Sequence, residues 1–212
     1  MKILITGSTG FIGKNLINNN FFLKHKILLI NSSKLNKNKN ILKSKIQNIN
    51  FKINQIKSFN PEAVIHLAWH GIPDYGKVIS KQNYKQQIKF FKTLKKVKSI
   101  KKIIVTGSCF EYGILSGKVN ESKKIKKYNF FSKAKINIYK YITNNFSEET
   151  KIIWLRLFYV YGSKQRDNAL IPYLIKALKS NINIDLNEPF AARDFVNVDD
   201  VNKIIIKCLS IK

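Results

Sequence analysis

The sequence predicts an α/β fold built on a parallel sheet with crossover helices. Short apolar runs alternate with longer helical patterns along most of the 212 residues, which is typical of parallel strands. A glycine-rich turn follows the first apolar run directly and supports the same fold class. The predicted strands are residues 2–6, 26–31, 63–67, 102–106 and 152–157, and the predicted helices are residues 11–20, 52–58, 78–98 and 131–146.

The first strand and the turn after it carry the strongest signal. Residues 3–5 are an apolar run fit for a buried parallel strand, and Gly7, Gly10 and Gly13 follow with G-x-x-G-x-x-G spacing. Such glycines allow a tight turn, let backbone N–H groups approach a pyrophosphate, and let helix and strand pack closely. The N-terminus of the next helix adds a positive dipole end. The pattern predicts a dinucleotide site; the alternative is a structural glycine turn.

The later segments are less regular. Residues 33–47 are rich in lysine and asparagine and are predicted to form a loop or a poorly defined connection. After Gly162 the pattern changes to a helix around residues 169–180, short extended pieces, and a last helix from about residue 199. We expect this last part to form a small cap rather than more sheet.

The formal net charge of +27 raises the question of a nucleic-acid partner. Only Arg156, Arg166 and Arg193 among the 39 basic residues are arginines, and the lysines are spread along the chain. Base readout and bidentate phosphate contacts favour arginine. The abundance of asparagine and isoleucine favours a codon bias towards A/T instead. We therefore expect no specific nucleic-acid partner, only salt-sensitive adventitious binding to polyanions.

The sequence also indicates the cellular compartment of the protein. We expect no secretory signal, because the first residues already form a strand. The most apolar early stretch, residues 21–30, is broken by Lys24 and Lys26, so no membrane span is expected. Cys109 and Cys208 form neither a disulfide framework nor a metal-site spacing. These features favour a cytoplasmic protein without a metal site.

Seven segments carry a family resemblance. They are residues 6–13 (TGSTGFIG), 64–69 (VIHLAW), Asn83, 106–113 (TGSCFEYG), Lys135, 155–162 (LRLFYVYG) and 193–199 (RDFVNVD). Over essentially its whole length the chain resembles the extended short-chain dehydrogenase/reductases of the NAD-dependent epimerase/dehydratase family. Residues 66–75 and 107–113 look closest to the branch that reduces or epimerises nucleotide-linked 4-keto-6-deoxy sugars.

This resemblance implies a Rossmann-like doubly wound parallel sheet, a bound NAD(P) and a Ser/Tyr/Lys catalytic set. It implies an NAD(P)-binding domain in residues 1–162 and a partial substrate-binding cap in residues 163–212. Within the cap, Arg193, Asp194 and Phe195 are expected to return to the core. Relatives normally continue beyond this motif, so we expect a C-terminally shortened chain with an incomplete cap.

The catalytic set is carried over only in part. Ser108 falls at the family's catalytic serine, whose hydroxyl would hold the substrate's carbonyl or hydroxyl oxygen. Lys135 matches the lysine that binds the nicotinamide ribose and lowers the pKa of the family tyrosine. The alternatives are a strand-end turn serine and a solvated helix lysine. Phe131 stands at the tyrosine position and cannot transfer a proton. Either Tyr128 or a water substitutes, or catalysis is lost; such a group is worth roughly 10²–10⁴ in rate.

Coenzyme choice rests on the end of the second strand. Asn31 replaces the expected acidic residue, and Ser32, Ser33 and Lys34 could bind a 2′-phosphate, which favours NADP(H) over NAD. Ordinary turn residues are the alternative. Tyr159 replaces a more usual asparagine near the nicotinamide. The implied coenzyme-binding residues are Gly7, Thr9, Gly10, Phe11, Ile12, Gly13, Asn31, Ser32, Asn48, Ile49, Ala68, Lys135 and Phe158.

The substrate side is implied by fewer residues. Arg193 resembles the family arginine that helps bind the diphosphate of a nucleotide sugar, although Asp194 or Asp199 could instead pair with it. Ser108 would contact the sugar. Glu111 and Tyr112 are expected to shape the same cleft.

Two functions stay open. One is NAD(P)-dependent reduction or epimerisation of a nucleotide-activated sugar by a homodimer, formed through the helices near residues 78–98 and 131–146. The other is a catalytically degenerate NAD(P)-binding protein of the same fold with a binding or regulatory role. Ser108, Lys135 and Arg193 favour the enzyme, whereas Phe131 favours the binding protein.

Overall fold

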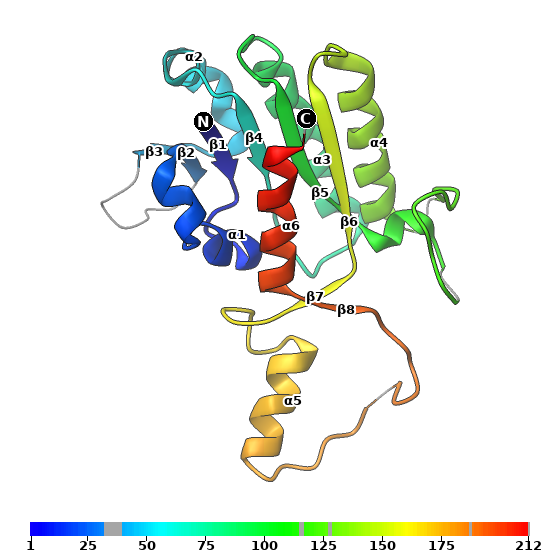
Figure 1. The fold of residues 1–212 in the computed structure, drawn as a ribbon. Coiled ribbons are helices and arrows are strands. Elements are labelled where there is room, and N and C mark those ends of the chain that lie inside the picture. The colour runs from blue at the N-terminus through cyan, green and yellow to red at the C-terminus, as the bar shows by residue number, and fades with distance from the viewer. Residues whose placement is uncertain (32–39, 115–116, 127–128, 187, 212) are drawn as a thin grey trace.

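Six parallel strands form the central sheet, in the order β3-β2-β1-β4-β5-β6. Figure 1 shows this computed structural model, which describes residues 1–31, 40–114, 117–126, 129–186 and 188–211. The strand order reverses between β1 and β4, and ligands of such sheets bind at this switch point, beyond the carboxyl ends of the strands. The strands are β1 (Lys2–Thr6), β2 (Lys26–Asn31), β3 (Asn40–Lys43), β4 (Ala63–His66), β5 (Lys102–Ser108) and β6 (Lys151–Leu157).

Helices cover both faces of the sheet, with α2, α3 and α4 on one side and α1 and α6 on the other (Figure 1). The Rossmann-like doubly wound fold predicted from the sequence is confirmed. The helices are α1 (Phe11–Leu16), α2 (Ile53–Phe59), α3 (Lys77–Leu94), α4 (Phe130–Asn145), α5 (Leu170–Lys179) and α6 (Val198–Ser210), with 3₁₀ helices η1 (Asn20–Lys24), η2 (Ile46–Lys52) and η3 (Cys109–Tyr112).

Alternate side chains of each strand enter the two core layers. Leu4 belongs to the same cluster as Phe90 and Phe91 of α3, whereas Ile3 and Ile5 belong to the cluster that includes α1 and α6. All five side chains are fully buried. Because both faces of the sheet are covered, its central strands need apolar residues at almost every position. This is why uninterrupted apolar runs located them correctly.

Two predicted segments were wrong in detail. The helix predicted over residues 11–20 ends at Leu16, because the Asn19 side chain accepts a hydrogen bond from the Phe21 N–H and caps η1 instead. The loop predicted over residues 33–47 contains β3 and the start of η2. β3 is an edge strand that pairs only with β2, so it forms without a continuous apolar run.

The segment after β6 leaves the sheet and returns to it. β7 (Tyr159–Tyr161) and β8 (Phe195–Asn197) form a separate two-stranded parallel ladder, and α5 lies between them in the chain. Figure 1 shows α5 apart from the sheet, while α6 packs on it through Val201 and Ile205. Residues 163–212 therefore include one helix that belongs to the sheet's own layers. None of the described helices is long and apolar enough to cross a membrane.

Candidate functional site

The glycine turn between β1 and α1 is closed to larger residues. Gly7 has φ of +74°, and a Cβ there would lie 2.6 Å from the backbone nitrogen of Ala68. A Cβ on Gly13 would lie 2.2 Å from the carbonyl oxygen of Gly7, whereas one on Gly10 would meet that oxygen at 3.3 Å. The first and third glycines are thus required for packing. The second leaves backbone N–H groups approachable from outside.

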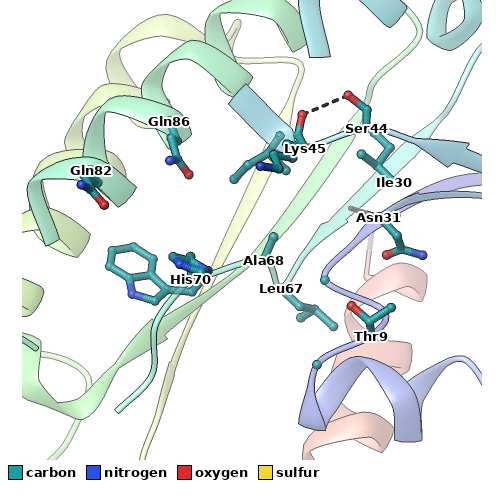
Figure 2. A pocket seen from close by; sticks show the side chains of 14 residues that line it. Thr9, Ile30, Asn31, Ser44, Lys45, Leu67, Ala68, His70, Gln82 and Gln86 are labelled. Carbon is teal, nitrogen blue, oxygen red and sulfur yellow. Dashed lines mark hydrogen bonds between the residues drawn. The ribbon is translucent and has the colours of Figure 1, made fainter. Parts of the chain in front are cut away.

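A cavity of about 490 Å³ opens beside this turn, at the carboxyl ends of β1, β2 and β4. Figure 2 shows Thr9 on the turn at one side and Gln82 and Gln86 of α3 across from it. The cavity is lined by Gly7, Thr9, Gly10, Ile30, Asn31, Ser44, Lys45, Ile46, Leu67, Ala68, Trp69, His70, Gln82 and Gln86.

The residues predicted to bind the coenzyme divide into three groups. Gly7, Thr9, Gly10, Asn31 and Ala68 line the cavity. Phe11, Ile12 and Gly13 begin α1, and Ile12 packs against the core. Of the remaining five, Asn48 is exposed, Ile49 is buried in the core, Lys135 is buried beside the cavity wall, Phe158 lines a different cavity, and Ser32 lies outside the described residues.

Sequence reasoning missed several lining residues. Ser44, Lys45 and Ile46 follow the edge strand β3, which the sequence did not reveal. Gln82 and Gln86 lie one helical turn apart on α3. Their i, i+4 spacing places them on one face, and this signal was available in the sequence.

Two buried donors in the cavity wall fit a polar ligand. The Asn31 Oδ1 accepts a hydrogen bond from Ser8 Oγ at 2.7 Å, whereas its Nδ2 has no hydrogen-bond partner among the described residues. The indole Nε1 of Trp69 is likewise buried without a partner there. A bare buried donor is costly. Ribose hydroxyls and phosphates are acceptors, so these donors and the open glycine turn fit a dinucleotide.

A buried hydrogen-bonded chain fixes the β4 end of the cavity. His66 Nδ1 lies 2.8 Å from Thr6 Oγ1, His66 Nε2 contacts the Gln87 side-chain oxygen, and Gln87 Nε2 donates to the Ala68 carbonyl at 2.8 Å. Burial lowers the pKa of His66 to about 3, so its ring is neutral. Asn83 adds a pair of 2.9 Å bonds, accepting from the His70 N–H and donating to the His70 carbonyl. Together these bonds hold the segment that lines the cavity.

Lys135 is buried against the sheet rather than solvated. Its Nζ donates to the Thr106 carbonyl at 2.7 Å and lies 4.2 Å from the centroid of the Trp69 ring. Burial lowers the pKa of Lys135 to about 8, and the nearby Glu111 carboxylate opposes that shift. Lys135 therefore stands between the end of β5 and the wall of the coenzyme cavity.

Ser108 ends β5 and caps η3. Its Oγ accepts from the Phe110 N–H at 3.3 Å, and its own N–H donates to Glu111 Oε1 at 2.8 Å. Ser108 and Lys135 thus lie around the same strand end. In its bond with the Phe110 N–H the Ser108 oxygen is the acceptor. The hydroxyl hydrogen is not used in that bond, so it can be donated to an oxygen of a ligand.

Glu111 serves the interior and not the cleft. Its fully buried carboxylate accepts from Trp154 Nε1 at 2.9 and 3.0 Å and from Arg156 Nε at 3.2 Å. Burial raises the pKa of Glu111, while the hydrogen bonds and the charges of Lys135 and Arg156 oppose the rise. Arg156 also donates to the Tyr112 hydroxyl at 3.3 Å. This network holds η3, and with it Ser108, against β6.

Phe131 is buried in an aromatic cluster. Its ring lies 5.0 Å from that of Trp69, 5.1 Å from that of Tyr75 and 6.2 Å from that of Phe110, measured between centroids. Only 6% of Phe131 is exposed. Tyr128, the substitute considered from the sequence, lies outside the described residues. Tyr75 was not predicted, because nothing local in the sequence brings it to residue 131.

A second cavity, of about 1050 Å³, reaches Cys109 and Phe110, the residues that follow Ser108. Arg193 lines it, donates to Glu188 Oε2 at 2.7 Å and stacks 5.7 Å from the Tyr159 ring centroid. Its described ion-pair partner is therefore Glu188, whereas the sequence suggested Asp194 or Asp199. The lining residues are Cys109, Phe110, Gly113, Ile114, Gly117, Lys118, Val119, Phe158, Tyr159, Ala192, Arg193 and Asp194.

Comparison with known proteins supports one family. The model of the NAD dependent epimerase/dehydratase family matches residues 3–211. CDP-abequose synthase of Salmonella muenchen is 30% identical over 98% of this chain and 70% of its own length. dTDP-6-deoxy-L-talose 4-dehydrogenase (NAD(+)) of Aggregatibacter actinomycetemcomitans is 24% identical over 95% of this chain and 77% of its own length.

Solved structures share the fold. A UDP-N-acetylglucosamine 4-epimerase from Methanobrevibacter ruminantium M1, in complex with UDP-N-acetylmuramic acid, superposes with a TM-score of 0.84 at 23% identity, over 99% of this chain and 73% of that one. A UDP-glucuronic acid 4-epimerase from Bacillus cereus, in complex with UDP-glucuronic acid and NAD, gives 0.82 at 23% identity, over 100% of this chain and 74% of that one.

Proposed function

Since this chain belongs to the NAD-dependent epimerase/dehydratase family, we propose that it binds a nicotinamide dinucleotide and reduces or epimerises a nucleotide-activated sugar of the 4-keto-6-deoxyhexose type. The observation that carries the proposal is the glycine turn, which only glycine can form and which opens onto a cavity at the switch point of the sheet. The names of the curated relatives point to CDP-, dTDP- and GDP-linked deoxy sugars as substrates.

The coenzyme half of the site follows from the donors present. The backbone of Gly7, Thr9 and Gly10 would hold the diphosphate, and the free amide of Asn31 would donate to the adenosine ribose. Lys135 would hold the nicotinamide ribose with the Nζ protons that the Thr106 carbonyl leaves free. A nicotinamide bound there supplies or accepts the hydride.

Preference for NADP(H) is the finer part of this proposal. Among the described residues that line the cavity, none carries a carboxylate, and Lys45 is one of them. A 2′-phosphate is therefore not repelled and has a cation within the same wall. Ser33 and Lys34, which the sequence also suggested, lie outside the described residues.

On the substrate side, Ser108 would donate to the reacting sugar oxygen and Arg193 would bind the diphosphate. Arg193 is available for this task, because its partner Glu188 is 69% exposed and the pair is weakened by solvent. The cavity that Arg193 lines reaches Cys109, next to Ser108. Such an arrangement would let both ends of a nucleotide sugar bind in one space.

A second candidate function rests on Phe131. Its ring is packed in an apolar cluster that holds no hydroxyl at the usual proton-donor position. A protein that binds the coenzyme without turnover would be a degenerate binding or regulatory member of the family. In both cases we infer a homodimer formed through α3 and α4. Light scattering coupled to size-exclusion chromatography would measure its mass.

Fluorescence titration with NADPH and NADH, followed by absorbance assays with CDP-, dTDP- and GDP-linked 4-keto-6-deoxyhexoses, tests these functions. Coenzyme binding with substrate-dependent oxidation supports the enzyme. Binding without oxidation of any sugar nucleotide supports the degenerate protein. If a folded sample binds neither coenzyme, both proposals are wrong.

A further inference from the structure

A phenol other than the family tyrosine lies beside Phe131. Tyr75, in the connection between β4 and α3, has its ring centroid 5.1 Å from that of Phe131 and 5.5 Å from that of Phe110. We propose that Tyr75 donates a proton to the sugar carbonyl oxygen that Ser108 holds, in place of the tyrosine that Phe131 has replaced. This inference rests on the proposed reductase function and assigns its missing acid.

The connection that carries Tyr75 is held in place by hydrogen bonds. The Asp74 N–H donates to the Gly71 carbonyl at 2.7 Å, and the Gly76 N–H donates to Asp74 Oδ1 at 2.7 Å. Ser80 Oγ donates to the Tyr75 carbonyl at 3.4 Å. Gly76 then caps α3. The phenol is thus presented by an ordered turn, which a proton donor requires if its hydroxyl is to meet one atom of a substrate.

Tyr75 neighbours residues that line the cavity assigned to the sugar. Its hydroxyl interacts electrostatically with Cys109, Tyr159 and Arg166. The first two of these line the 1050 Å³ cavity, as does Phe110, whose ring Tyr75 contacts. Phe110 also donates its N–H to Ser108 Oγ. Tyr75 and Ser108 therefore share their neighbours at one end of the space assigned to the sugar.

The ionisation of Tyr75 suits a donor. Partial burial raises its pKa above the ordinary value, and the charge of Arg166 opposes this rise. At neutral pH the phenol is protonated, so it can give a proton to a carbonyl oxygen. In the reductive direction the phenol therefore needs no prior deprotonation, whereas taking a proton from a sugar hydroxyl would first require Tyr75 to ionise.

The step balances as follows. A reduced nicotinamide bound in the coenzyme cavity would supply a hydride, with both electrons of the broken C–H bond, to the keto carbon, and the carbonyl π pair would move onto oxygen. That oxygen takes the proton of Tyr75, which leaves a sugar hydroxyl, an oxidised coenzyme and a tyrosinate. The tyrosinate regains its proton from water, because Tyr75 is 36% exposed.

Moving the hydroxyl between two positions tests the assignment. Tyr75→Phe keeps both ring contacts and should lower kcat by roughly 10²–10³. Adding Phe131→Tyr to that variant restores a hydroxyl at the family position and should recover at least about tenfold. Tyr173→Phe, on the exposed face of α5, is the matched control and should retain the wild-type rate. Circular dichroism confirms that all variants are folded.

Calorimetry supplies a readout that does not depend on turnover. With oxidised coenzyme present, the 4-hydroxy product of the accepted sugar nucleotide should bind about three- to tenfold more weakly to Tyr75→Phe, the loss of one hydrogen bond. Tyr173→Phe should bind it normally. Wild-type rate and affinity in Tyr75→Phe would overturn the assignment. So would a wild-type protein that binds coenzyme but reduces no 4-keto sugar, whereas a failure to bind either coenzyme would refute the proposed function itself.

Discussion

The coenzyme cavity beside the glycine turn and the larger cavity that Arg193 lines are built in different ways. The coenzyme cavity is shaped by backbone: a turn that only glycine can form, and a β4 end fixed by a buried hydrogen-bonded chain. The larger cavity is lined mostly by residues that follow β5 in the chain, together with Ala192, Arg193 and Asp194 from the segment between β7 and β8. A backbone site tolerates drift in the surrounding side chains, whereas a side-chain site changes with each substitution. Phe131 packs against Phe110, which lines the larger cavity, so a substitution at this position has chemical consequences.

The largest effect is expected from Gly13→Ala on the backbone side. Its Cβ would stand 2.2 Å from the Gly7 carbonyl oxygen, so the turn must open, at a cost of about 3 kcal/mol. The same displacement should weaken coenzyme binding roughly 100-fold. Urea unfolding and NADPH fluorescence titration measure the two effects. In Gly10→Ala the new Cβ would lie 3.3 Å from the same oxygen, a much milder contact, so this variant should lose clearly less stability. Equal losses in the two variants would contradict a packing role for Gly13.

The second-largest effect is expected from Glu111→Ala, in the buried network that holds η3. The variant leaves the Arg156 charge without its carboxylate partner and the Trp154 N–H without an acceptor, which should lower the free energy of unfolding by about 2–3 kcal/mol. Glu149→Ala removes a carboxylate of the exposed Lys101 pair and is the matched control, with an unchanged urea midpoint. If both variants unfold alike, the buried network does not hold the η3 turn.

Acid should lower the free energy of unfolding through His66, which lies in the buried hydrogen-bonded chain at the end of β4. Its pKa is lowered from 6.5 to about 3 by burial, so below pH 6.5 the unfolded chain binds a proton that the folded protein does not. Stability is therefore fully present above pH 6.5 and is lost as the pH falls towards 3, by about 2 kcal/mol at pH 5. Urea unfolding at pH 7 and pH 5 measures it. His66→Gln, although less stable, should lose less between those values; an equal loss would exclude His66.

The smallest predicted effect concerns coenzyme choice. Asn31→Asp puts a carboxylate into the cavity wall beside Ser8 and should weaken NADPH binding by about tenfold relative to NADH, because like charges repel. Fluorescence titration with both coenzymes measures the ratio. Asn54→Asp, exposed on α2, carries the same charge and should leave the ratio unchanged. An unaltered ratio in Asn31→Asp would show that position 31 does not face the 2′ substituent.

What the sequence could predict was local. The strands and the glycine turn are written in consecutive residues, so apolar runs and spacing located them. Lys45 and Tyr75 were missed because their positions depend on topology. Pairing of β3 with β2 brings residue 45 to the coenzyme cavity, and the β4–α3 connection brings residue 75 to residue 131. The family frame did reveal that Phe131 lacks a hydroxyl. It could not say which neighbour replaces it, since that neighbour is 56 residues away in the chain.

One short connection lines the coenzyme cavity and contacts Phe110, which lines the larger one. Residues 67–70 line the coenzyme side, and Tyr75 follows within the same stretch of chain before α3 begins. A molecule that immobilises one end leaves less conformational entropy for a second molecule to remove at the other. The two ligands should therefore promote each other's binding by one common factor, whichever arrives first. Calorimetric titrations in both orders would return that factor, and a factor of one would show that the connection transmits nothing.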